Sequence, residues 1–125
     1  ENPAVRAMAT FHGVFDGVES NVDNLPLGAG DEETDDAQSS NLLPAEVLIC
    51  NGVEDPFVPD KSLEQALGLL QKLNYRASLL QLVNAKHGFT NPAQDFNDNP
   101  SFAFQKEAAD KSWKQAVNMF QRALR

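Results

Sequence analysis

The run Val-Leu-Ile-Cys at residues 47–50 constrains the fold more than any other feature of this 125-residue chain. It is continuous and apolar, follows Glu46 and ends at Asn51-Gly52, without the alternation of polar and apolar residues that a half-exposed strand shows. Such a run is typical of a strand covered on both faces, as in parallel sheets. The sequence therefore predicts a strand over residues 46–51, with helices on both sides of its sheet.

Two further strands and two helices are predicted around this strand. Residues 5–11 are mostly apolar and stop at His12-Gly13, and residues 76–83 have strand-like flanks, although their leucines would also suit a helix. Apolar residues at helical spacing predict a helix over residues 60–74 and a long closing helix. We expect two large aromatic residues of the closing helix to lie in the core, namely Trp113 and Phe120.

This order of elements predicts an α/β domain, with parallel strands joined by right-handed crossovers and helices packed on the sheet. Three strands are few for a parallel sheet, because strands that are apolar on both faces need neighbours. The chain also starts without a methionine and almost at once enters a strand. We therefore expect further protein to cover a sheet edge, either an N-terminal half of the same protein or another subunit.

The net charge of −8 belongs to one segment, residues 16–41. This segment contains eight acidic residues and no Lys or Arg, whereas acids and bases balance in the rest of the chain. Its composition predicts an exposed loop inserted in a single domain that spans residues 1–125. A calcium site at residues 31–36 is an alternative, but the run lacks the ligand spacing of an EF-hand loop. The segment could equally be a docking surface for a basic partner.

Composition also excludes several classes of function. A sequence pI near 4.5 implies repulsion of a phosphate backbone, so we expect no nucleic-acid binding. The single cysteine, Cys50, cannot form an internal disulfide, and no His/Cys cluster has zinc-ligand spacing, so we expect no metal and no cofactor. No apolar run approaches the roughly 20 residues of a membrane-spanning helix, so we expect a soluble protein. The sequence does not indicate its cellular compartment.

Three residues that can carry chemistry follow the predicted strands directly: His12, Asp55 and His87. Ligand sites of open parallel sheets lie at the carboxyl ends of the strands. In a triad of nucleophile, base and acid, a carboxylate orients an imidazole and stabilises its protonated form. Asp55 and His87 are therefore candidates for the acid and the base, although each taken alone would suit a turn or a loop. We interpret His12 as a turn residue near the same strand ends, with a contact to the site as the alternative.

These residues lie in segments that together resemble the C-terminal half of the dienelactone hydrolase family, a branch of the α/β-hydrolases. The segments are Phe11-His12-Gly13, residues 47–59 with Asp-Pro-Phe-Val-Pro, residues 87–92 (His-Gly-Phe-Thr-Asn-Pro), and residues 107–113 in the closing helix. The resemblance implies that Asp55 is the triad acid and His87 the base. It also implies that the three strands are the last of an eight-stranded sheet, and that the complete protein hydrolyses an ester or a lactone.

The sequence departs from the family pattern in two places. The nucleophile of the family, a Cys or Ser in a Gly-x-Cys/Ser-x-Gly turn, does not occur in these 125 residues. Cys50 cannot replace it, because Cys50 lies inside a predicted strand and is interpreted as a core residue. The acidic segment over residues 16–41 is also longer than is usual in the family. We therefore expect this chain alone to be inactive, and the alternative function is a non-catalytic structural or interaction subunit.

Overall fold

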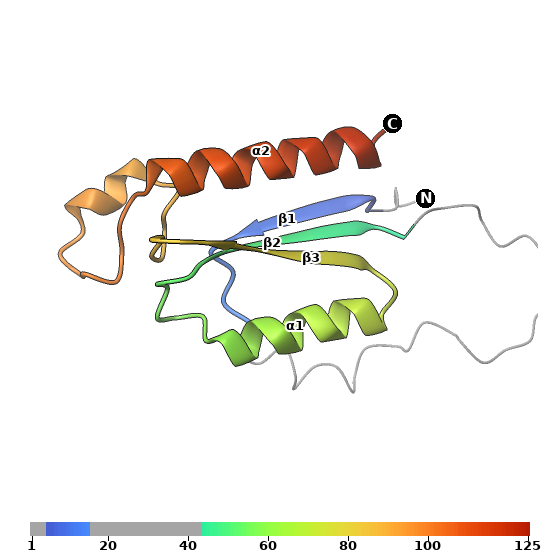
Figure 1. Ribbon diagram of the computed structural model, residues 1–125, viewed down its shortest axis with the longest axis horizontal. Helices are drawn as coiled ribbons and strands as arrows, with labels where there is room; N and C mark the ends of the chain where they lie inside the picture. The colour runs from blue at the N-terminus through green and yellow to red at the C-terminus, as the bar shows by residue number, and fades with distance from the viewer. Residues whose placement is uncertain (1–4, 16–43) are drawn as a thin grey trace, which may run out of the picture.

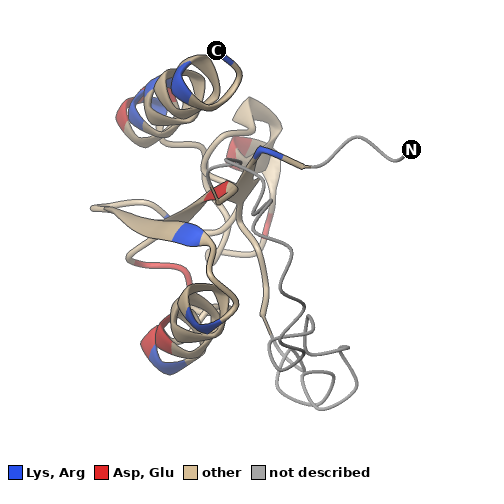
Figure 2. Cartoon of the chain, turned by 90° about the vertical axis from the view of Figure 1, so that its right-hand side faces the viewer, with Lys and Arg blue, Asp and Glu red and all other residues tan. Residues whose placement is uncertain are grey.

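The computed structural model describes residues 5–15 and 44–125, in which three parallel strands lie between two helices (Figure 1). Within this part, the strands are β1 (Ala7–Phe11), β2 (Glu46–Gly52) and β3 (Arg76–Leu82), in the order β1-β2-β3. Helix α1 (Asp60–Lys72) covers one face of the sheet, and α2 (Lys106–Ala123) covers the other. Figure 2 looks almost along both helices and shows the sheet between them. The predicted α/β class and parallel sheet are confirmed.

The central strand β2 pairs with both neighbours in parallel register. Phe11 of β1 lies beside Cys50, and Cys50 lies beside Leu80 of β3. The carboxyl ends of the three strands therefore meet at one edge of the sheet, and the loops that follow them leave from that edge (Figure 1).

The core consists of two apolar layers, one on each face of β2. Side chains that alternate along β2 point to opposite faces. On the α2 side, Leu48 and Cys50 pack with Met119, and on the α1 side Val47 and Ile49 pack with the helix. The layer under α1 is completed by Val58 and Leu63. Because both faces are covered, β2 has no need of polar positions, which explains the continuous apolar run in the sequence.

The ends of the elements differ slightly from the predicted ones. β1 begins not at residue 5 but at Ala7, where its pairing with Glu46 begins, and β3 ends at Leu82, which pairs with Gly52 at the end of β2. Helix α1 ends at Lys72, and Asn74 follows with a positive φ of 64°. A left-handed residue just after a helix is a common way of ending it.

The prediction that Trp113 lies in the core is wrong, since this residue is 64% exposed. The buried face of α2 is formed by small residues and one methionine, at positions Ala108, Ser112, Ala116 and Met119. Trp113 follows Ser112 and is therefore turned about 100° away from that face. Phe120 is half-buried and packs against the core on the α2 side.

The predicted acidic loop at residues 16–41, with its alternative calcium site, lies outside the described residues. In residues 5–15 and 44–125, no three His, Cys, Asp or Glu side chains group together as metal ligands. No helix in this part of the chain is long and apolar enough to cross a membrane.

The connection between β3 and α2 contains a short 3-10 helix, η2 (Pro92–Phe96), which the sequence did not predict.

Candidate active site

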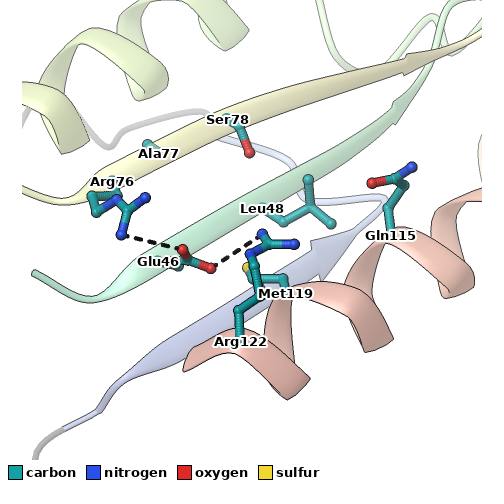
Figure 3. A pocket seen from close by; sticks show the side chains of 8 residues that line it. All are labelled: Glu46, Leu48, Arg76, Ala77, Ser78, Gln115, Met119 and Arg122. Atoms are coloured by element: carbon teal, nitrogen blue, oxygen red, sulfur yellow. Dashed lines mark hydrogen bonds and ion pairs between the residues drawn. The ribbon is translucent and has the colours of Figure 1, made fainter. Parts of the chain in front are cut away.

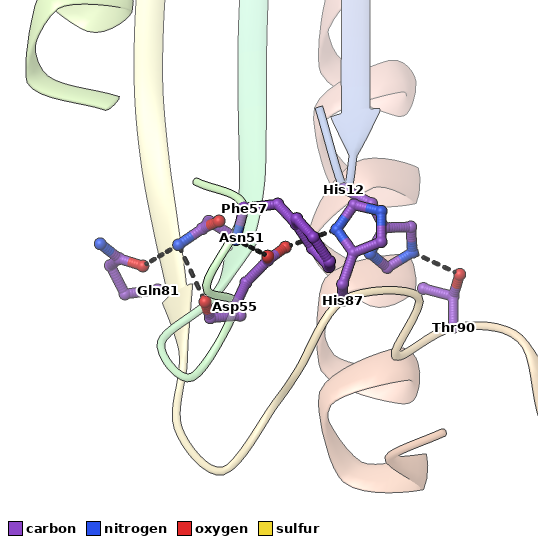
Figure 4. A network of polar contacts seen from close by, with 8 residues as sticks. His12, Asn51, Asp55, Phe57, Gln81, His87 and Thr90 are labelled. Carbon is purple, nitrogen blue, oxygen red and sulfur yellow. Dashed lines mark hydrogen bonds and ion pairs between the residues drawn. The ribbon is translucent and has the colours of Figure 1, made fainter. Parts of the chain in front are cut away.

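The carboxyl ends of the strands bring together the three residues that the sequence singled out (Figure 4). His12 follows β1, Asp55 lies in the turn after β2, and His87 lies in the loop after β3. The turn of Asp55 is closed by a hydrogen bond from its N–H to the carbonyl oxygen of Gly52 (3.0 Å). Each residue therefore lies in the segment that follows a strand of the same sheet.

Asp55 and His87 are in direct contact. Oδ2 of Asp55 lies 2.7 Å from Nδ1 of His87, and the Asp55 side chain is only 1% exposed. The second carboxylate oxygen, Oδ1, accepts a hydrogen bond of 2.9 Å from the backbone N–H of Phe57. A carboxylate is an acceptor only, so the neutral ring carries its proton on Nδ1. Among the described residues, Nε2 of His87 has no hydrogen-bond partner and is left as the acceptor.

Aromatic rings enclose the imidazole of His87 on several sides. The ring centroids of Phe57 and Phe102 lie 5.1 and 5.2 Å from that of His87, and the ring of His12 lies 5.8 Å away. All three rings meet it edge to face. The side chain of His87 remains 20% exposed. The surrounding rings restrict its rotation while a part of the imidazole stays accessible.

Backbone hydrogen bonds fix the loop that carries His87. The N–H of His87 donates to the carbonyl oxygen of Ser101 (3.1 Å), and residues 87 and 102 form an isolated parallel bridge. The turn before Asp55 is tied to the same loop, since the N–H of Glu54 donates to the carbonyl oxygen of Ala85 (2.9 Å). The loops of the acid and of the histidine are therefore joined through their main chains as well as through their side chains.

The buried amide of Asn51 supports the turn before Asp55, a role that no local sequence pattern indicates. Nδ2 of Asn51 donates to Oε1 of Gln81 (2.9 Å) and to the carbonyl oxygen of Gly52 (3.0 Å), as Figure 4 shows. That carbonyl is the one that closes the turn of Asp55. The sequence predicts only that Asn51-Gly52 ends a strand. The pairing of residue 51 with residue 81 in adjacent strands is the signal that could have pointed to this bond.

His12 lies at a bend directly after β1, as predicted, and its ring is close to that of His87. Its Nε2 is 2.8 Å from Oγ1 of Thr90, and its ring packs edge to face on Phe89 at 4.4 Å. Nδ1 is buried and has no hydrogen-bond partner among the described residues. Burial, followed by the nearby His87, lowers the pKa of His12, and Asp55 opposes this effect. His12 is therefore a neutral imidazole at pH 7.

Cys50 lies apart from these residues, inside β2. It is 1% exposed and packs in the apolar layer on the α2 side, which confirms that it is a core residue. Burial raises the pKa of its thiol to about 11. A thiol that remains protonated and enclosed is a poor nucleophile.

A second polar cluster lies at the opposite end of the sheet, away from the candidate site. Glu46 pairs with Arg76 at 3.5 Å and with Arg122 at 3.4 Å, beside a pocket of about 280 Å³ (Figure 3). Both arginine side chains are more than half exposed. Such pairs are worth about 0–1 kcal/mol each. We interpret the cluster as a surface ion-pair network that joins β2 to β3 and α2.

Comparisons with known proteins agree with this architecture. The model of the family described as "Dienelactone hydrolase family" matches residues 1–124. No curated protein matches the chain. Among solved structures, a dienelactone hydrolase-like promiscuous phosphotriesterase from metagenomic libraries has a TM-score of 0.69 and 24% sequence identity. That match covers 94% of this chain and 42% of the other protein, and shows the fold.

Two more solved structures are similar over a smaller part of the chain. The protein m3DLH has a TM-score of 0.60 and 28% identity, over 63% of this chain and 33% of that one. A putative dienelactone hydrolase from Klebsiella pneumoniae subsp. pneumoniae has a TM-score of 0.50 and 25% identity, over 62% and 29% of the two chains. The present chain thus spans less than half the length of each of these proteins.

Proposed function

Because the chain belongs to the dienelactone hydrolase family, we propose that it contributes the acid and the base of an ester- or lactone-hydrolysing catalytic triad. In this proposal Asp55 is the acid and His87 is the base. One observation carries it: the 2.7 Å contact between Oδ2 of the buried Asp55 and Nδ1 of His87, at the carboxyl ends of neighbouring strands. This is the arrangement in which a carboxylate sets the tautomer of a general base.

The nucleophile and the oxyanion hole belong to another part of the protein in this proposal. No Gly-x-Cys/Ser-x-Gly motif occurs in the 125 residues, and Cys50 is buried within a strand. The solved structure with the highest TM-score of the three extends over more than twice the length matched here, which leaves room for such a segment. Without a nucleophile the pair can hold a proton but cannot attack a carbonyl group. We therefore expect residues 1–125 alone to be inactive.

The chemistry that the pair would perform follows from its hydrogen bonds. Nε2 of His87 takes the proton of the thiol or hydroxyl nucleophile as this group adds to the ester carbonyl carbon. The same proton then passes to the leaving alcohol oxygen as the ester C–O bond breaks and an acyl-enzyme forms. A water molecule hydrolyses the acyl group in a second, equivalent step, which returns the nucleophile. Asp55 stays ionised and stabilises the imidazolium of His87 in both steps.

The proposal is tested on the full gene product that contains this chain, with 4-nitrophenyl acetate as the probe. We expect the full protein to release 4-nitrophenol, and His87→Ala to lower kcat by about 10³-fold or more, because removal of a triad member has effects of this size. Lys86→Ala is a matched control, since Lys86 is the neighbouring residue and, in residues 5–15 and 44–125, its Nζ bonds only the Pro100 carbonyl. We expect this control to retain kcat.

Two results would contradict the proposal. A His87→Ala variant that keeps the activity of the full protein would show that His87 is not the base. A full gene product that has no activity, and no Cys or Ser at the expected turn, would favour the alternative of a non-catalytic structural or interaction subunit.

A further inference from the structure

His12 contacts two residues of the loop after β3, Thr90 and the proposed base His87. The proposed chemistry gives His12 no role. His12 is the residue directly after β1, whereas Thr90 lies three residues after His87. The 2.8 Å bond between His12 Nε2 and Thr90 Oγ1 therefore ties the loop of His87 to a strand that is separated from it by β2 (Figure 4). This bond is a direct side-chain link between the end of β1 and that loop.

The ring of His12 also forms part of the wall around His87. It lies 5.8 Å from the imidazole of His87 and 4.4 Å from the ring of Phe89, which is completely buried. Phe89 belongs to the core layer under α2, so the position of His12 is set by the core. Phe57 and Phe102 enclose other sides of the imidazole of His87. Removal of the His12 ring would leave one of these sides open.

His12 combines a left-handed backbone conformation with a lowered pKa. Its φ is 62°, a left-handed conformation that costs a residue with a side chain about 1 kcal/mol or more. Burial and the nearby His87 lower its pKa, so it places no second positive charge beside His87. A Lys or Arg at this position would oppose the protonation of His87 that the proposed reaction requires. The side chain of His12 therefore forms a hydrogen bond to Thr90, offers an aromatic ring to His87 and is uncharged.

We infer that His12 is a positioning residue, which holds the imidazole of His87 in the orientation that bonds Asp55 by anchoring Thr90 and packing against the ring. This inference rests on the proposed function, since it assigns His12 a part in the same site. His12 acts through His87 and touches neither the nucleophile nor the carbonyl carbon. Loss of either contact should leave substrate binding intact and weaken proton transfer.

The test compares His12→Phe and Thr90→Val with the unmodified full gene product. His12→Phe keeps a ring and loses the hydrogen bond, and Thr90→Val keeps the shape of residue 90 and loses its hydroxyl. The first readout is the solvent-exchange rate of the Nδ1 proton of His87 in ¹H–¹⁵N spectra, which needs no catalysis. We expect this rate to rise about tenfold in both variants, as for loss of one neutral hydrogen bond.

The second readout is the turnover of 4-nitrophenyl acetate. We expect kcat to fall about tenfold in each single variant with KM unchanged, and the double variant to be no worse than either single one, because both changes remove one interaction. His12→Gln, whose amide can bond Thr90 but which lacks the ring, should recover only a part of kcat, and the remaining deficit reports the ring contact. Ser78→Ala is the control: it removes a hydroxyl from β3 beside the pocket of Glu46, away from His12, and should alter neither readout.

The outcomes separate this inference from the proposed function. If exchange of the His87 proton is unchanged in both His12→Phe and Thr90→Val, and both fold with unaltered melting temperature, His12 does not position His87. If exchange rises but His87→Ala itself leaves kcat unchanged, the positioning stands as a structural fact and the proposed function fails. Thr90→Val alone decides the matter if His12→Phe does not fold.

Discussion

Gly52 passes so close to the carbonyl oxygen of Ala85 that a β-carbon on Gly52 would lie 2.4 Å from that oxygen. The two residues belong to the turn that leads to Asp55 and to the loop that leads to His87. Their contact accompanies the hydrogen bonds from Val53 to Leu82 and from Glu54 to Ala85. The absence of a side chain at residue 52 is therefore what lets these loops lie against each other.

We expect Gly52→Ala to lower the free energy of unfolding by about 1–3 kcal/mol, because backbone atoms must move to admit the methyl group. The matched control is Gly68→Ala in α1, where an added β-carbon would meet no atom within 4 Å. This control should raise the free energy of unfolding by about 0.5–1 kcal/mol through the helix propensity of alanine. Urea denaturation of both variants measures the difference, and equal effects would contradict this account of the loop contact.

Trp113 and Met119 lie in the same helix but differ in burial. We expect Trp113→Ala to change the free energy of unfolding by less than about 1 kcal/mol, since Trp113 is mostly exposed. Met119→Ala should cost about 2–5 kcal/mol, since Met119 is buried in the layer under α2. Denaturant titrations of the two variants check this order. A larger loss for Trp113→Ala would mean that further protein covers this side chain.

The thiol of Cys50 should resist modification in the folded protein. Its raised pKa, about 11, leaves roughly a hundredfold less thiolate at pH 8 than its usual value of 9.0 would, and the side chain is enclosed as well. We expect 5,5′-dithiobis(2-nitrobenzoate) to react with Cys50 at pH 8 only after denaturant is added. Rapid reaction without denaturant would place the thiol at the surface, against its position in β2.

Protonation of His12 should link stability to pH. Because its pKa is lowered in the folded state, the folded protein binds fewer protons than the unfolded chain in the range just below pH 6.5. The contribution of His12 is therefore fully present above pH 6.5 and is lost as the pH falls through the lowered pKa. We expect the loss of unfolding free energy between pH 7.5 and pH 5, measured with urea, to be smaller in His12→Phe. An identical loss in both proteins would show that His12 does not titrate as described.

The sequence predicted the elements well where a local pattern carries the information. The apolar run before Asn51 specifies a central strand because both faces of β2 are covered, and the spacing from Leu63 onward specifies α1. Asp55 and His87 also follow neighbouring strands, as expected, since β2 pairs with β3. Their roles as acid and base remain a prediction that the experiments above test.

The rest depends on contacts between distant residues, which a local pattern does not contain. Trp113 fits helical spacing, but the buried face of α2 was decided by the close packing of Ala108, Ser112 and Ala116 against the sheet. The bond between His12 and Thr90 joins residues 78 positions apart. It exists only because the loop after β3 passes over the ends of both other strands.

The central claim is that Asp55 sets the orientation and charge of His87 during ester hydrolysis, and the most direct measurement is kcat of Asp55→Asn in the full gene product. The matched control is Asp98→Asn, the same change at an exposed position of the loop before α2. With 4-nitrophenyl acetate we expect Asp55→Asn to lower kcat by about 10⁴-fold, because the amide favours the wrong tautomer of the base, and Asp98→Asn to leave it unchanged. A kcat for Asp55→Asn that matches the control would contradict the claim.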